Sequence, residues 1–339
     1  MQARGPGRVN LIGEHTDYNA GLALPFAIAR GVTVTAEPIA GERVQAQALD
    51  LGEDDEFALA GPERTTGWRA FVRGTVAELS AAGYALRPCR LTVEGDLEQG
   101  LGLSSSAALE TALCLALLAV AGEEEPADRR ELAKLCSRVE NDWVGAETGL
   151  LDQLASLYGD PGGAIRIDFA SLDIEPVPLA LGDWSLVTLD SGAAHSIAAS
   201  GYNDRRRECR EACEHLGLET LREATASDLR RLPEPLAARA RHVLTENARV
   251  DAMVVALRAG DLAEAGRLLD ASHASLRDDY DASVPEVERT VTRLKAAGAA
   301  GARMVGGGFG GAVLALLGPG VDAPAGAVTV GPGPRAALM

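Results

Sequence analysis

Lysine is nearly absent from this chain of 339 residues, which contains only Lys134 and Lys295. Positive charge as a whole is scarce, because 32 lysines and arginines face 49 acidic residues and leave a formal net charge of −17. A nucleic-acid backbone or an anionic membrane surface attracts a positively charged patch. The composition therefore argues against both as the main partner. It does not exclude small anions, which a few arginines and backbone N–H groups can bind.

Long apolar runs and a signal segment are also missing. The longest nearly apolar stretch, 107–121, includes Glu110 and Thr111 and is shorter than the ~20 residues that span a membrane. It therefore predicts a buried helix. The N-terminus lacks the charged and then apolar pattern of a secretory signal. The five cysteines form no CxxC pair and include an odd one, which favours reduced thiols in a cytoplasmic protein over metal or disulfide roles.

What the chain does have is the composition of a folded protein. Hydrophobic residues make up 47% and charged residues 24%, so a substantial core can form. A single core rarely grows beyond ~250–300 residues, and this length leaves one large domain or two of ordinary size open. In the first half, strand patterns at 32–39 and 90–95 alternate with helix patterns at 107–121 and 130–143.

The second half of the chain is dominated by helical patterns. Helices are predicted at 203–216, 235–259, 262–276 and 284–297, and strands at 164–169, 184–190, 302–305 and 312–317. The loop with Pro176 and Pro178 predicts a domain boundary at about 165–182. We therefore expect an α+β architecture with two lobes, residues 1–170 and 171–339. A cleft between lobes is the usual place for a ligand.

The first polar motif spans residues 6–21, PGRVNLIGEHTDYNAG. It gathers a cation and several hydrogen-bonding side chains around glycines, where a plain structural segment would hold apolar residues. These polar residues are Arg8, Asn10, Glu14, His15, Asp17, Tyr18 and Asn19. Such a set is suited to a polyhydroxylated ligand. A capped polar loop on the surface is the alternative explanation.

The second motif spans residues 100–110, GLGLSSSAALE. Glycines and serines lead directly into a helix, which places free backbone N–H groups and hydroxyls at the positive end of the helix dipole. The candidate phosphate-binding residues are Gly100, Gly102, Ser104, Ser105 and Ser106. Because serine is also an ordinary N-cap, a purely structural role stays open. No G-K-[ST] sequence occurs, so arginine, backbone and metal must neutralise the phosphate.

The third motif, TGLLDQ at 148–153, carries Asp152 among leucines at the predicted start of a helix. A carboxylate there is stabilised by the helix dipole, and an acid on an otherwise apolar surface is a candidate for proton abstraction. A helix-start aspartate without a catalytic role is the alternative.

The fourth motif, VGGGFGGA at 305–312, is rich in glycine. Glycines allow the backbone to approach a ligand closely, and they also form tight hairpins. The motif by itself does not distinguish the two.

Together the four motifs resemble those of the GHMP kinase superfamily, and the first is similar, almost residue for residue, to the motif of its galactokinase branch. The serine-rich motif resembles the phosphate loop of the family, and GGGFGG resembles its third motif. Two further stretches also look like galactokinases, HSIAASGYNDRRR at 195–207 and SHASLRDDY at 272–280. The resemblance thus extends from about residue 4 to about residue 317.

The resemblance implies a fold and a reaction. The fold is α+β with two lobes, an N-terminal lobe like the second domain of ribosomal protein S5 and a ferredoxin-like C-terminal lobe. The reaction is transfer of the γ-phosphate of ATP to the anomeric hydroxyl of α-D-galactose, with Mg²⁺ as cofactor. Galactose and ATP are the implied partners, and no nucleic acid, membrane or obligate protein partner is implied.

The resemblance also implies roles for individual residues. Asp152 would be the catalytic carboxylate and Arg8 its partner beside the transferring phosphate. Ser106 and Glu140 would bind Mg²⁺, which prefers hard oxygen ligands. The phosphate path would be lined by the serine-rich motif, residues 104–106. The sugar hydroxyls would be held by Glu14, His15, Asp17, the backbone of Gly149 and Tyr202.

The chain departs from the family pattern in a few places. Thr148 and Leu151 replace a Cys and a Met that are common beside the catalytic aspartate, and Ala312 replaces a frequent Cys. The chemistry depends on none of these side chains. Family members usually carry a longer segment before the first motif, so we expect the N-terminal edge to be trimmed.

Two alternative functions remain at this point. One is a kinase of a related sugar, such as N-acetylgalactosamine or arabinose, which would differ in the room beside the second carbon of the sugar. The other is a non-catalytic sensor of galactose and ATP. The presence of Arg8, Ser106, Glu140 and Asp152 argues against the sensor.

Overall fold

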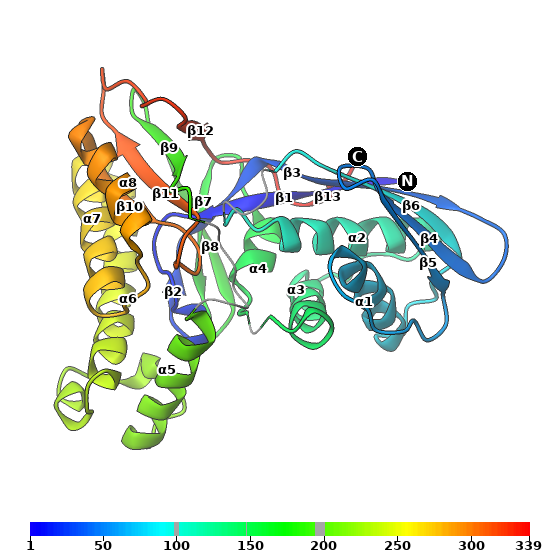
Figure 1. Cartoon of the computed structure of the whole chain (residues 1–339), viewed down its shortest axis with the longest axis horizontal. Coiled ribbons are helices and arrows are strands. Elements are labelled where there is room, and N and C mark those ends of the chain that lie inside the picture. Colours follow the sequence, from blue (N-terminus) through cyan, green and yellow to red (C-terminus); the bar gives the residue numbers. More distant parts are fainter. Residues whose placement is uncertain (98–101, 147, 194–200) are drawn as a thin grey trace.

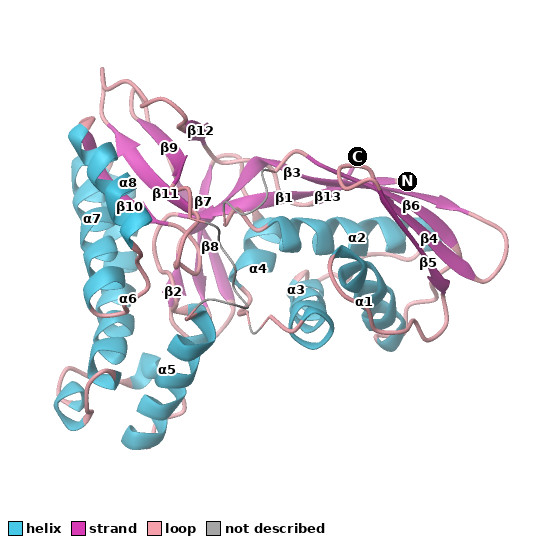
Figure 2. Cartoon of the chain, viewed as in Figure 1, coloured by secondary structure: helices cyan, strands magenta, loops and turns pink. Residues whose placement is uncertain are grey.

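The structure is a computed structural model that describes residues 1–97, 102–146, 148–193 and 201–339 (Figure 1). It combines three sheets with helices, so the predicted α+β fold class is confirmed (Figure 2). No helix in the described ranges is both long and apolar enough to cross a membrane.

The first half of the chain forms a six-stranded sheet with helices on one face (Figure 1). Its strand order is β13 (Ala337–Leu338), β1 (Gln2–Asn10), β3 (Pro25–Pro38), β6 (Cys89–Gly95), β4 (Arg43–Ala48) and β5 (Glu53–Ala58). The strand predictions at 32–39 and 90–95 fall in β3 and β6 and are confirmed. The helices are α1 (Trp68–Ala81), α2 (Ser105–Ala121), α3 (Arg130–Arg138) and α4 (Leu151–Tyr158).

The helix α2 is the buried centre of this layer. It packs against β1 and β3, and 14 of its side chains, from Ala107 to Ala121, are buried. Glu110 and Thr111 are buried with them, so the helix has no solvent-facing polar stripe. The prediction of a buried helix at 107–121 is confirmed.

The helix predicted at 130–143 changes its geometry partway. It begins as α3 and continues as the π-helix η2 (Val139–Val144), which carries Glu140 in its first turn. The wider π turn often occurs at functional sites, because it redirects side chains from the regular helical face. Leu132, Cys136 and Val139 are buried, so one face of this segment packs in the core.

The prediction of a loop around Pro176 and Pro178 is wrong, because both prolines lie in strand β8 (Asp173–Pro178). This strand is the edge of a three-stranded sheet in the order β2 (Leu22–Ala23), β7 (Gly163–Asp168) and β8. An edge strand tolerates proline, since the missing N–H can face the side without a neighbour.

The second half of the chain builds a four-stranded sheet in the order β10 (Ala299–Met304), β11 (Ala312–Leu317), β9 (Ser185–Asp190) and β12 (Val328–Val330). Its helices are α5 (Tyr202–Leu216), α6 (Leu236–Ala259), α7 (Leu262–Asp278) and α8 (Pro285–Ala296), each within two residues of its prediction. Short helices η1 (Asp17–Asn19), η3 (Leu221–Glu223) and η4 (Asp228–Arg231) complete the fold. The division into residues 1–170 and 171–339 stays a prediction. The strand β13 itself pairs with β1 in the first sheet.

The two halves meet where β1 ends. Arg303 on β10 is fully buried and donates hydrogen bonds to the carbonyls of Asn10 and Leu11, 2.9 and 3.1 Å away. One apolar cluster joins both halves here, with Val9 and Ile12 packed in the same core as Val250 and the rest of its α6 face. The polar loop after β1 is therefore fixed between the halves, where its residues line a cavity.

Candidate active site

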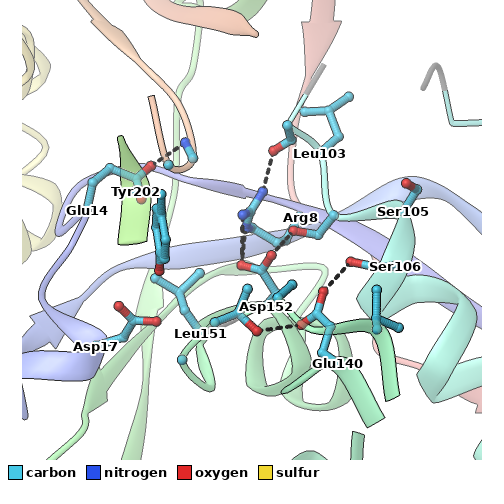
Figure 3. A pocket seen from close by; sticks show the side chains of 18 of the residues that line it. Arg8, Glu14, Asp17, Leu103, Ser105, Ser106, Glu140, Leu151, Asp152 and Tyr202 are labelled. Carbon is cyan, nitrogen blue, oxygen red and sulfur yellow. Dashed lines mark hydrogen bonds and ion pairs between the residues drawn. The ribbon is translucent and has the colours of Figure 1, made fainter. Parts of the chain in front are cut away.

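A cavity of about 390 Å³ lies at this junction (Figure 3). All four motifs contribute to its wall. The predicted site residues among its lining are Arg8, Glu14, His15, Asp17, Gly102, Ser104, Ser105, Ser106, Glu140, Gly149, Asp152 and Tyr202. Gly100, the remaining predicted residue, and residues 195–200 of the stretch 195–207 lie outside the described residues. The sequence thus predicted a set of residues that the fold gathers in one place.

An ion pair stands at the centre of the cavity. Asp152, in the first turn of α4, accepts from Arg8 Nε at 2.8 Å and lies 2.7 Å from Arg8 Nη2 (Figure 3). The Arg8 side chain is 7% exposed and also donates to the carbonyl of Gly102 at 2.5 Å. Among the described residues that line the cavity, Arg8 is the only lysine or arginine. A single fixed cation therefore faces whatever negative charge enters.

Ser104 completes the surroundings of Asp152. Its backbone is left-handed at φ 58°, and its hydroxyl donates to Asp152 Oδ2 and caps no helix N–H. The ordinary N-cap role that the sequence left open therefore does not apply to this serine. The second motif is tied to the third through its side chain.

Glu140 lies near the Arg8–Asp152 pair and accepts three hydrogen bonds from side chains. Its carboxylate accepts from Ser106 Oγ at 2.7 Å, Thr148 Oγ1 at 2.7 Å and Gln153 Nε2 at 2.8 Å. Burial, and then the nearby Asp152, raise the pKa of Glu140 above its ordinary value. A cation bound here would offset both effects. The predicted metal ligands Ser106 and Glu140 are in direct contact.

Glu14 points from the first motif toward the fourth. Its Oε1 accepts the N–H of Gly306 at 2.8 Å, and Arg303 Nη2 lies 3.5 Å away (Figure 3). Burial raises the pKa of Glu14, although the positive charges of Arg303 and Arg8 act in the opposite direction. The surface loop considered for this motif is excluded, because Glu14 and His15 are each 4% exposed.

His15 adopts a left-handed backbone, with φ 61°, and its carbonyl accepts from Asn19 Nδ2 at 2.8 Å. Its ring nitrogens lie 2.7 Å from Tyr18 Oη and 3.2 Å from the carbonyl of Gly307. Burial lowers the pKa of His15 to about 3. The ring is therefore neutral at physiological pH.

Asp17 lies in η1, lines the cavity and is close to Gly149. A Cβ on Gly149 would overlap the Asp17 carboxylate, so no larger residue fits at 149 without displacing it. Burial, and then the negative charges of Asp152 and Glu14, raise the pKa of Asp17 to about 6. Asp17 is thus ionised at neutral pH but close to its titration.

A buried carboxylate on α6 holds the first motif from behind. Glu246 is fully buried, and its Oε1 accepts from the N–H of Gly13 at 3.0 Å and from Ser272 Oγ at 2.6 Å. Burial raises the pKa of Glu246, but Arg249, 2.6 Å away, and other positive neighbours outweigh it and lower the pKa to about 2. Glu246 is therefore a permanent anion that fixes the backbone before Glu14.

Sequence reasoning missed the residues that support the site. The sequence predicts no role for Gln153 within the third motif, and none for Arg303 or Glu246. Gly13 and Glu246 are 233 residues apart, and Gly306 and Glu14 are 292 apart, so no local pattern links them. In the stretch 272–280, which resembles galactokinases, Ser272 donates to the same carboxylate of Glu246.

Comparison with known proteins gives a consistent result. Family models match the chain over residues 1–38 (galactokinase galactose-binding signature), 70–160 (GHMP kinases N terminal domain) and 253–326 (GHMP kinases C terminal). The galactokinase of Roseiflexus sp. is 42% identical over 330 residues, covering 93% of this chain and 82% of that protein. The galactokinase of Mycobacterium bovis is 44% identical over 320 residues, covering 92% and 87%.

A solved structure agrees with the sequence relatives. The crystal structure of Lactococcus lactis galactokinase complexed with galactose matches with a TM-score of 0.93 and 33% identity, over 100% of this chain and 95% of that chain.

Proposed function

Since the chain belongs to the galactokinases of the GHMP kinase family, we propose that the cavity transfers the γ-phosphate of ATP to the anomeric hydroxyl of galactose, giving galactose 1-phosphate and ADP. One observation carries the proposal. The Arg8–Asp152 pair opens into the same cavity as Glu14, His15 and Asp17. A carboxylate and a cation suited to phosphoryl transfer thus adjoin a cluster suited to a sugar.

Asp152 is proposed as the carboxylate that orients the anomeric hydroxyl or accepts its proton. Its Oδ1 is occupied by Arg8 and its Oδ2 by the hydroxyl of Ser104, so the group is fixed before substrate arrives. Arg8 balances the charge that spreads over the phosphoryl oxygens. Because the transition state of phosphoryl transfer is loose, positioning and electrostatics contribute more than a strong base.

Mg²⁺ is proposed to bind at Ser106 and Glu140. The donor set fits, since a hydroxyl and one carboxylate leave coordination positions for water and phosphate oxygens, which Mg²⁺ usually keeps. The described residues contain no cluster of three or more His, Cys, Asp or Glu side chains that would form an all-protein metal cage. When bound, the ion supplies positive charge to the β- and γ-phosphates. The serine-rich motif lines the same path, with backbone N–H groups at the start of α2.

Glu14, His15, Asp17, Gly149 and Tyr202 are proposed to bind the sugar. Galactose and glucose differ only in the direction of the fourth hydroxyl. A site that pairs with the axial group leaves its own polar group without a partner when glucose enters, and such sites discriminate by ~10⁴-fold or more.

The test is ADP release by the purified protein with a panel of sugars, with the product identified by ³¹P NMR. We expect galactose 1-phosphate, and a preference for galactose over glucose of about 10⁴-fold in kcat/KM. N-acetylgalactosamine and arabinose belong in the panel, because they report on the room beside the second and fifth carbons. Equal activity with glucose would contradict the proposal and leave a general sugar kinase, and ADP release at the same rate without any sugar would leave only an ATPase.

A further inference from the structure

A row of hydrogen-bonding side chains leads from His15 away from the cavity into the second half of the molecule. His15 Nδ1 lies 2.7 Å from Tyr18 Oη, which lies 2.9 Å from Tyr280 Oη. Tyr280 Oη in turn lies 3.1 Å from Cys209 Sγ on α5. Tyr280 is fully buried and Cys209 is 2% exposed. The stretch 272–280, to which the reaction assigns no role, ends in this tyrosine.

The position of every proton in this row follows from one backbone carbonyl. His15 Nε2 lies 3.2 Å from the oxygen of Gly307, and a carbonyl can only accept, so the proton of the ring is on Nε2. In a neutral ring Nδ1 is then an acceptor, and it takes the proton of Tyr18. The oxygen of Tyr18 must accept from Tyr280 as a result. The hydroxyl proton of Tyr280 is thereby used, and the thiol of Cys209 donates to its oxygen.

The surroundings support this arrangement. Burial lowers the pKa of His15 to about 3 and raises that of Cys209 to about 11, so the ring carries one proton and the thiol keeps its own at neutral pH. Asn19 Nδ2 lies 3.6 Å from Cys209 Sγ, and an amide N–H can only donate, so the sulfur accepts from Asn19 while it donates to Tyr280. Tyr280 also packs on the His15 ring, with 4.6 Å between centroids.

We propose that Tyr18, Tyr280 and Cys209 are positioning residues that keep His15 Nδ1 occupied as an acceptor, so that His15 offers the cavity only a hydrogen-bond donor, Nε2–H. The inference rests on the proposed function for its sugar ligand. The bond from Nε2 to Gly307 is long for an N–H···O bond, and both His15 and Gly307 line the cavity, so the same proton is available to a sugar oxygen. His15 therefore recognises a sugar oxygen as an acceptor, whereas the ionised Asp17 recognises a hydroxyl as a donor.

This division makes a prediction about sugar analogues. Fluorine in place of a hydroxyl accepts a hydrogen bond weakly and cannot donate one. We expect one ring position at which the fluoro sugar is phosphorylated at least 10-fold better than the deoxy sugar, because His15 faces an acceptor there. At a position that faces Asp17, the fluoro and deoxy sugars are both expected to be poor, since neither can donate.

The first experiment determines the tautomer and the charge of the His15 ring. Long-range ¹H–¹⁵N spectra distinguish the two neutral tautomers and the charged form, and the chain has only five histidines, so the His15 signal is assignable by its loss in His15→Gln. In the wild-type protein without ligands we expect the Nε2–H tautomer at pH 7. An Nδ1–H tautomer or a charged ring would overturn the proposal. The spectrum needs no activity, so this result is independent of whether galactose is the substrate.

The second experiment uses Tyr18→Phe and Tyr280→Phe. We expect the His15 tautomer to become mixed in Tyr18→Phe, and the KM for galactose to rise about 10-fold in both variants with little change in the KM for ATP. Cys209→Ser keeps a donor and should behave like the wild type, whereas Cys209→Ala should resemble a mild form of Tyr280→Phe.

Tyr158→Phe is the matched control, because the hydroxyl of Tyr158 also donates a hydrogen bond to a side chain, Asp128, but lies outside the row that ends at His15. A higher KM for galactose with an unchanged tautomer would show that the tyrosines act only through packing, and would overturn the proposal. If a tyrosine variant fails to fold, the wild-type spectrum and the fluoro sugars still test whether His15 is a donor toward the cavity.

Discussion

The two ends of the cavity are built in different ways. At the proposed sugar end, the functional groups are held by parts of the chain that are far away in sequence: the N–H of Gly306 holds Glu14, and the buried Glu246 holds Gly13. At the phosphate end, the functional groups hold one another, as in the Arg8–Asp152 and Ser106–Glu140 pairs. Substitutions at the phosphate end should therefore cause large and non-additive losses, and substitutions behind the sugar end smaller and graded ones.

The largest effect is expected for Asp152→Asn, which keeps the shape of the side chain but removes its charge. We expect kcat to fall by at least ~10²-fold, the scale of a positioned acid or base. Steady-state kinetics measure the loss, and circular dichroism checks the fold. Arg8→Ala combined with Asp152→Asn should cost less than the sum of the two single changes, because each partner loses its function when the other is removed. Near wild-type turnover in Asp152→Asn would show that this carboxylate is not catalytic.

A second large effect is expected for Glu140→Ala, and it should be limited to the Mg²⁺ dependence of the reaction. We expect the free Mg²⁺ concentration for half-maximal rate to rise at least about 10-fold, since one of the proposed ligands is lost. Galactose affinity, measured by calorimetry without nucleotide, should stay within about 2-fold. The carboxylate of Glu140 bonds to Ser106, Thr148 and Gln153, and none of these is a proposed sugar ligand. Glu131→Ala is the control, because Glu131 pairs with Lys134 on the surface of α3. Weaker galactose binding with an unchanged metal titration would make Glu140 a structural residue.

A smaller effect is expected behind the sugar end, for Glu246→Gln. The amide oxygen can still accept from Gly13, but the charge that pairs with Arg249 is lost. We expect the KM for galactose to rise about 10-fold, equivalent to one weakened hydrogen bond, with kcat within about 3-fold. Asp270→Asn is the matched control, since Asp270 also accepts a backbone N–H, that of Ala302, away from the sugar motif. A loss in kcat as large as that of Asp152→Asn would abolish the contrast between the two ends.

The smallest effect concerns Asp17 and pH. The pKa of about 6 in the folded protein lies above the ordinary value of 3.8, so the folded state binds this proton more tightly than the unfolded state. The group therefore contributes to stability at low pH, and this contribution is lost as pH rises through about 6. Asp17→Asn should raise the Tm by roughly 2–4 °C at pH 8 and leave it unchanged at pH 4.

The same titration should appear in catalysis. The kcat/KM for galactose is expected to fall about 10-fold per unit as pH drops below about 6, because protonated Asp17 accepts poorly from a hydroxyl. Glucose activity, measured in parallel, should not follow the same curve. A flat profile between pH 5 and 7 would show that ionised Asp17 does not bind the sugar.

The sequence predicted the groups that face the cavity better than the groups behind them. Local patterns are sufficient for α2, for Asp152 at the start of α4 and for the polar loop after β1, because each depends on neighbours within a few residues. The edge strand with Pro176 looked like a loop, since its place in a sheet depends on tertiary structure. Arg303 lies in a short stretch of small residues, and nothing near it in sequence signals that its partners are Asn10 and Glu14.

The link between Gly306 and Glu14 also bears on the order of folding. Closing a contact across 292 residues carries a large entropic cost, and contacts of such separation usually form late. The sheet of the first half and the helices of the second can assemble from nearer neighbours, but the sugar end is unformed until they dock. Sugar affinity is therefore a property of the finished molecule, and galactose should stabilise only the last step of its assembly, by mass action on the fully folded state.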